Sequence, residues 1–439
     1  MSAEKEKYYL IYRKFLDIFL FFLLFSLQVG RINLKSWGIP VSWGRSIDNL
    51  VVAFYLLWFF GMIVFRRRDL KRTSWDIPIW SLIIFLGLST WQTITYFHSF
   101  PARYAFPARD IARNSWDNYR AMLSGWLIFL AVTSRLSARP KLSILKKIIV
   151  LALFCVCLIG LIRYLSGIDH PDARDRFSTA TLHPNGLGIY LTMISPLFII
   201  HFALSHRKKE KIIWAGLLLF LLAALAFTFS RTSWVAFFVA LLYLLLCARS
   251  RRVSYTVLSI GALALILVLS HSRLRQRIVT LPSWPRDENL ERRLTYIRSA
   301  LKMVHDSPLW GIGYGSLAFH SNYRMYYKEK NTGELVQDPH NLYLNFAATA
   351  GLPALLFFLW LVLRVFRTSY RNPGGEDREL FAWRLTFQAG FLSFLCIGLA
   401  ESPFYTYHLL SFFWFFLALG AIVNGQVKSA PARDFTTRD

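Results

Sequence analysis

The stretch IWAGLLLFLLAALAFTFSRTSWVAFFVALLYLLLCA at residues 213–248 decides the fold of this chain. It contains two apolar runs, 213–229 and 233–248, with a short polar turn at 230–232 between them. Each run approaches the roughly 17 to 25 residues that an α-helix needs to cross the hydrocarbon core of a bilayer. The turn leaves almost no room between the two runs, so we expect Arg231 at the membrane boundary. The stretch therefore predicts a hairpin of two transmembrane helices.

Apolar runs of this length recur along the chain of 439 residues, of which 55% are hydrophobic and 17% aromatic. They predict an all-α polytopic membrane protein with about 12 transmembrane helices. No Ala-x-Ala cleavage site follows the first run, so we expect that run to stay as an anchor and not to be removed as a signal peptide. The four cysteines lie inside apolar runs and are expected to be small core residues. The predicted segments are 15–29, 46–65, 77–97, 119–133, 148–167, 186–204, 213–229, 233–248, 254–270, 342–366, 381–400 and 408–424.

The formal net charge of +26 at pH 7 is compatible with nucleic-acid binding or with basic cytoplasmic loops and sites for an anionic ligand. A chain this apolar, without a recognition motif, argues against nucleic acid as a partner. The positive-inside rule instead places the basic connections, and both termini, in the cytoplasm. We expect three regions: transmembrane helices 1–9 in 1–270, a large periplasmic loop with amphipathic helices in 271–341, and transmembrane helices 10–12 with a cytoplasmic tail in 342–439. The basic connections are 66–72, 135–147, 206–211, 249–252 and 364–378.

The long polar loop contains an amphipathic helix and a glycine-rich turn. Apolar residues recur at helical spacing over 289–305, and Arg292, Arg293, Arg298 and Lys302 occupy other positions. The arginines form either a solvated face of an interfacial helix or a cationic surface that holds phosphate. The Gly311-Ile312-Gly313-Tyr314-Gly315 run predicts a sharp loop. It is weak as a nucleotide motif, because the strand and helix of a βαβ unit are missing around it.

The loop ends in Asp338-Pro339-His340-Asn341 and runs directly into the next predicted helix. The positive end of the helix dipole disfavours the imidazolium form, so we expect His340 to be neutral, as a general base requires. The alternative is a histidine that only satisfies carbonyl groups of the loop. Three further polar groups are predicted at the same membrane face. Arg231 is either functional or snorkels to lipid headgroups. Asn185 begins a helix whose N-terminus favours anions. Pro184 and Gly186 are equally well explained as residues that only mark the start of that helix. Glu401 is placed to orient a base or an arginine.

Four motifs in this order resemble the O-antigen ligase and O-antigen polymerase superfamily over about 180–365: HPNGLGIYL (183–191), TFSRTSW (228–234), RLTYIRSALKMVHDSPLWGIGYGS (293–316) and DPHNLYLNFAATAGLPALL (338–356). The resemblance implies that Arg231, Arg293 and His340 are the functional residues. Arg293 fits the family spacing, but Ile297 stands where the family often has tryptophan, so Arg292 stays an alternative.

The resemblance also implies a substrate and a reaction. The donor would be a glycan on undecaprenyl diphosphate, and the acceptor lipid A–core for a ligase or another lipid-linked repeat unit for a polymerase; we favour the ligase. Arg231 and Arg293 would hold the diphosphate, and His340 would deprotonate the acceptor hydroxyl in an inverting displacement without metal or cofactor. We expect the substrate to contact Arg292, Arg298, Asn185, Asn341 and Tyr314. The enzyme would lie in a bacterial inner membrane, among membrane lipids, with its site facing the periplasm.

Two other classes of protein are less consistent with the sequence. A non-catalytic polysaccharide or lipid transporter is expected to have internal repeats and polar residues at mid-membrane depth. Here the polar signals gather at one face instead. Lipid-phosphosugar transferases with catalytic carboxylates in their first outer loop are disfavoured, because 30–45 contains no Asp or Glu.

Overall fold

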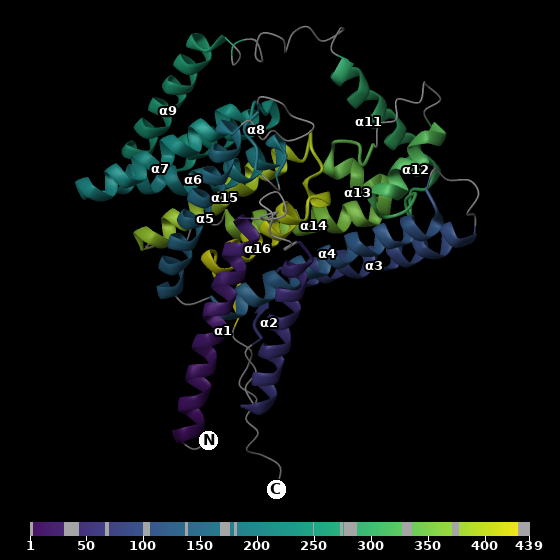
Figure 1. Cartoon of the computed structure of the whole chain (residues 1–439), viewed down its shortest axis with the longest axis horizontal. Coiled ribbons are helices and arrows are strands. Elements are labelled where there is room, and N and C mark those ends of the chain that lie inside the picture. Colours follow the sequence, from purple (N-terminus) through teal and green to yellow (C-terminus); the bar gives the residue numbers. More distant parts are fainter. Residues whose placement is uncertain are drawn as a thin grey trace.

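The computed structural model describes residues 3–29, 44–65, 70–99, 106–136, 139–166, 176–179, 182–248, 250–272, 275, 288–326, 336–370 and 377–428. Figure 1 shows these as an arrangement of α-helices. The helices are α1 (Ala3–Val29), α2 (Gly44–Val64), α3 (Asp76–Ser99), α4 (Ala108–Arg135), α5 (Arg139–Leu165), α6 (Pro184–Leu204), α7 (Lys208–Phe227), α8 (Arg231–Cys247), α9 (Arg251–Ser270), α11 (Glu288–Asp306), α12 (Ser316–Tyr326), α13 (Leu342–Ala350), α14 (Leu352–Ser369), α15 (Arg378–Ile397) and α16 (Tyr407–Val423), with a 3₁₀ turn at Pro403–Tyr405. The strands β1 (Arg72–Thr73) and β2 (Val427–Lys428) pair antiparallel, with Arg72 opposite Lys428.

The predicted all-α membrane class is confirmed. Among the described residues, six helices are long and apolar enough to cross a membrane: α3, α5, α6, α7, α14 and α15. The apolar parts of α2, α8 and α16 are shorter. Every predicted segment overlaps a helix, while the number of about 12 spans stays a prediction. The proposed loop at 271–341 is described only in part, and within that part it holds α11 and α12.

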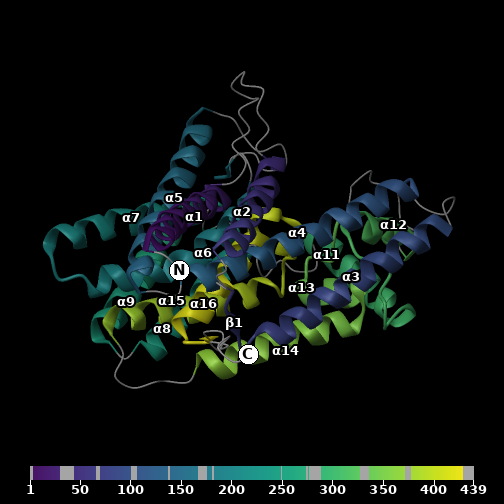
Figure 2. The same ribbon diagram turned by 90° about the horizontal axis from the view of Figure 1, so that it is seen from below.

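The centre of the molecule is formed by α4, α6, α15 and α16. The apolar windows of α6 and α15 are 83% and 78% buried, against 22% for α7, so the first two are interior helices. Gly390 of α15 lies against the Met193 carbonyl of α6, where a Cβ would come within 2.4 Å. A small residue at this point lets the two helices approach closely. Figures 1 and 2 show α1 and α2 next to each other, extending from this centre, and α3 alongside α4.

One predicted helix is in fact two. The continuous span expected at 342–366 is broken at Gly351, which ends α13 and precedes α14. Gly351 has φ +91°, and a Cβ there would lie 2.1 Å from the carbonyl oxygen of Leu309. Leu352 N–H then donates to the Pro308 carbonyl at 2.7 Å. The break therefore exists because the segment after α11 packs against the backbone at this point.

The glycine-rich run makes the predicted sharp loop. Gly311, Gly313 and Gly315 all have positive φ, at 69°, 121° and 126°. The N–H groups of Ile312 and Gly313 donate to the Ala348 and Thr349 carbonyls of α13. The loop is thus part of the packing that holds α11 and α12 over α13. A second apolar cluster closes this layer, formed by Tyr296, Ala300, Met303, Phe319, Tyr323, Val336 and Ala348.

Candidate active site

A single carboxylate joins three of the residues that the sequence singled out. Glu401 follows α15, and its side chain is 11% exposed. Its Oε1 accepts hydrogen bonds from Arg293 at 3.1 Å and from Asn185 Nδ2 at 3.0 Å. Its Oε2 lies 3.4 Å from His340 Nδ1. Four segments that are far apart in the sequence therefore meet at one buried acid.

His340 is held by its neighbours on both sides. It is one of two described non-glycine residues with positive φ, at 51°, and its N–H donates to Asp338 Oδ1 at 2.6 Å. Asn341 caps α13 through its side chain, which accepts from Leu344 N–H at 2.8 Å and donates to the Leu399 carbonyl at 3.0 Å. A positive φ at a non-glycine residue is a strained backbone conformation of the kind that clusters at functional sites. The imidazole lies stacked on the Tyr296 ring, with 5.8 Å between the ring centroids.

Arg293, and not Arg292, is the arginine of the amphipathic helix that reaches the cluster. Its two terminal nitrogens donate to the Ala400 carbonyl at 3.2 Å and to Glu401. Arg292 and Arg298 are exposed, on parts of α11 that face away from the buried Tyr296 and Ala300. The side chain of Arg293 is 34% exposed, so part of its guanidinium is open to a ligand.

Arg176 links the cluster to the turn before Arg231, and the sequence analysis did not identify it. Its Nε donates to the Thr228 carbonyl at 2.8 Å, and its NH2 group donates to Asn185 Oδ1 at 2.7 Å. Asn185 therefore uses both ends of its amide, one toward Arg176 and one toward Glu401. Arg176 stands alone in a polar connection, and no sequence spacing marks it as functional, because its partners lie in α6 and in the turn before α8.

Arg231 is the first residue of α8, three positions after Thr228. The first turns of α6 and α8 are in close contact, since a Cβ on Gly188 would lie 2.4 Å from Ser233 Oγ. Thr192 Oγ1 also donates to the Ser233 carbonyl at 3.2 Å. Arg231 is thus at the same end of these helices as Asn185, as the sequence predicted.

Tyr314 lies in a different environment from the one expected for a residue that contacts substrate. It is 5% exposed and belongs to the main apolar core. Its N–H donates to Thr93 Oγ1 of α3 at 2.8 Å, and burial raises the pKa of its phenol. In this structure its side chain packs in the core, and its contact with substrate stays a prediction.

The carboxylates around His340 shift its pKa in the direction opposite to that expected from the helix dipole. Burial alone would lower the pKa of the imidazole, but the hydrogen bond to Glu401 and the charges of Asp338 and Glu401 outweigh burial, and the pKa is raised. Burial would likewise raise the pKa of Glu401, but His340 and Arg293 outweigh it, and the pKa is lowered. Both shifts favour an imidazolium–carboxylate pair. The neighbouring carboxylates thus act against the helix dipole, which by itself disfavours the imidazolium form, and a neutral His340 stays a prediction.

Burial raises the pKa of Asp338, although His340 and Ser402 oppose the shift. Its carboxylate accepts the backbone N–H of His340, so it fixes the turn and not the imidazole ring. In the part of the chain that the structure describes, no group of three or more His, Cys, Asp or Glu residues is arranged to hold a metal ion.

Comparison with known protein families gives one result. Residues 187–359 match the family model described as O-antigen ligase. The match includes Arg231, Arg293 and His340, while Arg176, Asn185 and Glu401 lie outside it. A search of curated proteins finds no match. The match over 187–359 supports the resemblance of this part of the chain to the O-antigen ligase superfamily.

Proposed function

We propose that this protein transfers a glycan from undecaprenyl diphosphate to a hydroxyl group of lipid A–core at the periplasmic face of a bacterial inner membrane. The observation that carries the proposal is the contact of Glu401 with His340, Arg293 and Asn185 at one end of the membrane helices. A base and a guanidinium within reach of one another are what a displacement at a sugar diphosphate requires. The resemblance to the family supplies the class of reaction.

In the proposed mechanism, His340 acts through Nε2. Nδ1–H donates to Glu401, which fixes the tautomer and leaves the Nε2 lone pair toward the acceptor hydroxyl. The hydroxyl oxygen attacks the anomeric carbon as its proton passes to Nε2. The bond from that carbon to the diphosphate oxygen breaks, and its electron pair stays on the leaving diphosphate. One displacement inverts the anomeric configuration, and Glu401 stabilises the imidazolium that forms.

The arginines have the complementary task. Negative charge grows on the diphosphate as the sugar leaves, and guanidinium groups can bind two phosphate oxygens at once. We assign this role to Arg231 and Arg293, with Arg176 and Asn185 as positioning residues for Glu401. Arg293 donates to Ala400 and Glu401 through two of its five N–H groups, which leaves donors for a phosphate.

The proposed topology has about 12 spans, both termini in the cytoplasm, and 271–341 as a periplasmic loop over the site. Its lipid-linked donor would reach the arginines from the membrane. The alternating basic connections support this orientation. Fusions of a periplasm-dependent reporter after 248 and within 271–287 would test it, with activity expected only for the second.

Transfer of purified lipid-linked glycan to purified lipid A–core tests the function directly. The wild-type protein should form product and His340→Ala should not; full activity of this variant would refute the assignment of the base. The alternative function is a polymerase with the same donor and a lipid-linked repeat unit as acceptor. Lipopolysaccharide from a deletion strain separates the two. Loss of a ligase leaves free core and accumulated lipid-linked polymer, whereas loss of a polymerase leaves core capped by single repeats.

A further inference from the structure

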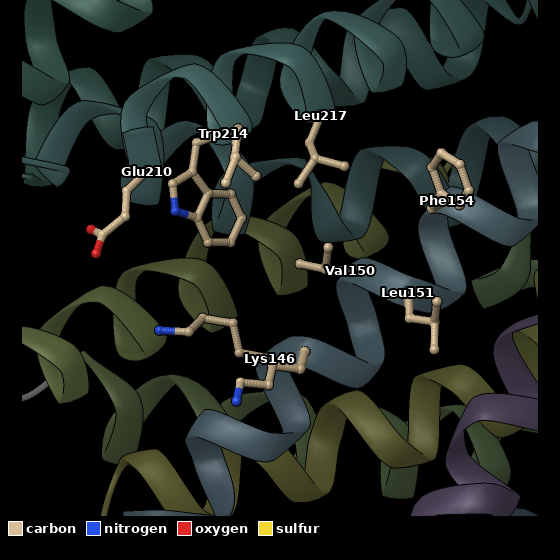
Figure 3. Close-up of a pocket in the computed structure, with 9 residues that line it drawn as sticks. Lys146, Val150, Leu151, Phe154, Glu210, Trp214 and Leu217 are labelled. Atoms are coloured by element: carbon tan, nitrogen blue, oxygen red, sulfur yellow. The ribbon is translucent and has the colours of Figure 1, made fainter. Parts of the chain in front are cut away.

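Two adjoining cavities lie at the end of α6 and α15 that is opposite to Glu401. The first, of about 450 Å³, is a groove between α5 and α7 with apolar walls (Figure 3). Trp214 and Leu217 of α7 face Val150 and Leu151 of α5 across it. The second, of about 600 Å³, is a polar chamber where α6, α7 and α15 meet. The cavities share Lys146, Glu210 and Trp214, so an apolar slot opens into a charged chamber.

The chamber is lined by three cations and three carboxylates, and two further cations, Lys147 and Arg252, lie beside it. Lys146 pairs with Glu379 at 3.2 Å, and Arg207 with Glu210 at 3.6 Å. Arg378 lines the chamber and Lys147 the groove, and neither contacts a carboxylate within the described residues. Both linings together hold Lys146, Lys147, Arg207 and Arg378 against Glu210, Asp377 and Glu379, and Arg252 beside His206 adds a fifth cation, so a net positive charge remains over the pair of cavities.

Two arginines converge on the ring of His206 at the chamber. Arg252 of α9 directs a guanidinium N–H to His206 Nδ1 at 3.0 Å, and Arg378 of α15 directs one to Nε2 at 2.5 Å. A guanidinium only donates, and a neutral imidazole has only one acceptor nitrogen. His206 can therefore accept from only one of the two arginines at a time. Arg378 also donates to the Leu204 carbonyl at 2.6 Å, and an anionic oxygen between the two guanidinium groups would give both a charged acceptor.

We propose that this pair of cavities binds an anionic glycerophospholipid. One acyl chain occupies the groove between α5 and α7, and the phosphate lies in the chamber near Arg252 and Arg378. An apolar slot that ends beside two converging arginines matches such an amphiphile, and basic groups between membrane helices are known to bind anionic headgroups. The basic connection 206–211 and Arg252 adjoin the chamber, so the lipid would come from the cytoplasmic leaflet. The site is independent of the proposed transferase reaction.

Native mass spectrometry of the purified full chain in detergent tests the proposal. Phosphatidylglycerol and phosphatidylcholine with identical acyl chains are the probes. The wild-type protein should prefer phosphatidylglycerol. The triple variant Lys147→Gln, Arg252→Gln and Arg378→Gln should lose that preference at least tenfold, since each cation near an anionic lipid surface is worth about fivefold in binding.

The control removes the same charge from the same face. Lys208, Lys209 and Arg251 are exposed and outside the lining of both cavities. Their triple glutamine variant should keep the wild-type preference. An equal loss in both triple variants would show general surface charge and overturn the site, as would a wild-type protein without preference.

A crosslinking experiment avoids variants altogether. Phosphatidylglycerol with a diazirine near the end of one acyl chain should label wild-type peptides that contain Val150, Leu151, Phe154 or Leu217. Labelling that is spread evenly over the exposed apolar helices would contradict the proposal. This pattern identifies the groove whether or not the glutamine variants fold.

Discussion

Replacement of Glu401 by glutamine tests the centre of the proposed site. Glutamine keeps the shape and one carbonyl acceptor but removes the charge that faces His340 and Arg293. In the transition state His340 becomes an imidazolium, and Glu401 stabilises it through a charge-assisted hydrogen bond. Such bonds are worth about 1.5–3 kcal/mol. The lower half of this range applies because 38% of the His340 side chain is exposed. We therefore expect roughly a 10- to 50-fold loss of transfer rate.

The dependence of the rate on pH gives a second, independent readout. The base must be unprotonated, so the wild-type rate should fall as pH decreases through the raised pKa of His340, above its ordinary 6.5. Without the Glu401 charge, burial lowers that pKa, and the midpoint of the fall should move to lower pH. The rate deficit of Glu401→Gln should consequently be largest at high pH and shrink in acid.

Asp306 provides a matched control. Its carboxylate lies 3.1 Å from His305 Nδ1, but both side chains are exposed. Asp306→Asn removes a carboxylate from a histidine in the same region without touching the cluster, so the rate and the pH midpoint should not change. The reasoning fails if Glu401→Gln keeps a rate within twofold of wild type. It also fails if the rate falls while the midpoint stays fixed, because that pattern indicates only a structural role.

Three further expectations concern other parts of the molecule. Arg293→Ala should lower the transfer rate by about 10²- to 10³-fold, as loss of a group that stabilises transition-state charge does, whereas Arg292→Ala should keep at least half of it; equal effects would refute the assignment. Gly351→Ala should lower the unfolding temperature in detergent, because the residue has positive φ and its Cβ would meet the Leu309 carbonyl at 2.1 Å, and an unchanged temperature would contradict the packed break. A chelator should leave transfer unchanged, and loss of activity that returns with added divalent cation would reveal an ion site.

Local patterns in the sequence predicted the helices and the residues near their ends. Apolar runs mark membrane helices because bilayer thickness sets their length, which is why the helix that holds Asn185 was found within two residues of its start. The amphipathic stripe placed Arg293 on a helix, but the position of Arg292 one residue earlier left two arginines open. Only the contact with Glu401 separates them.

Interactions between distant segments were beyond such patterns. The break at Gly351 was missed because apolarity continues through it, although the Gly-Leu-Pro sequence contains both residues that interrupt helices. Arg176 was missed because its hydrogen bonds reach residues in two other segments. The shift of the His340 pKa was missed for the same reason. The helix dipole is local, whereas the decisive carboxylate lies 61 residues away in sequence.

The shared carboxylate also explains how donor binding and base chemistry could be coupled in the proposed reaction. Arg293 and His340 compete for the negative charge of Glu401, one on each oxygen. A bound diphosphate attracts Arg293, and every weakening of the Arg293–Glu401 pair leaves more of the carboxylate charge for His340. That raises the basicity of Nε2 and stabilises its protonated form when the donor is in place. A double-mutant cycle of Arg293→Ala and Glu401→Gln measures this coupling. Losses that add independently would mean that the two residues act separately, whereas a double variant no slower than Arg293→Ala alone would show that they act as one unit.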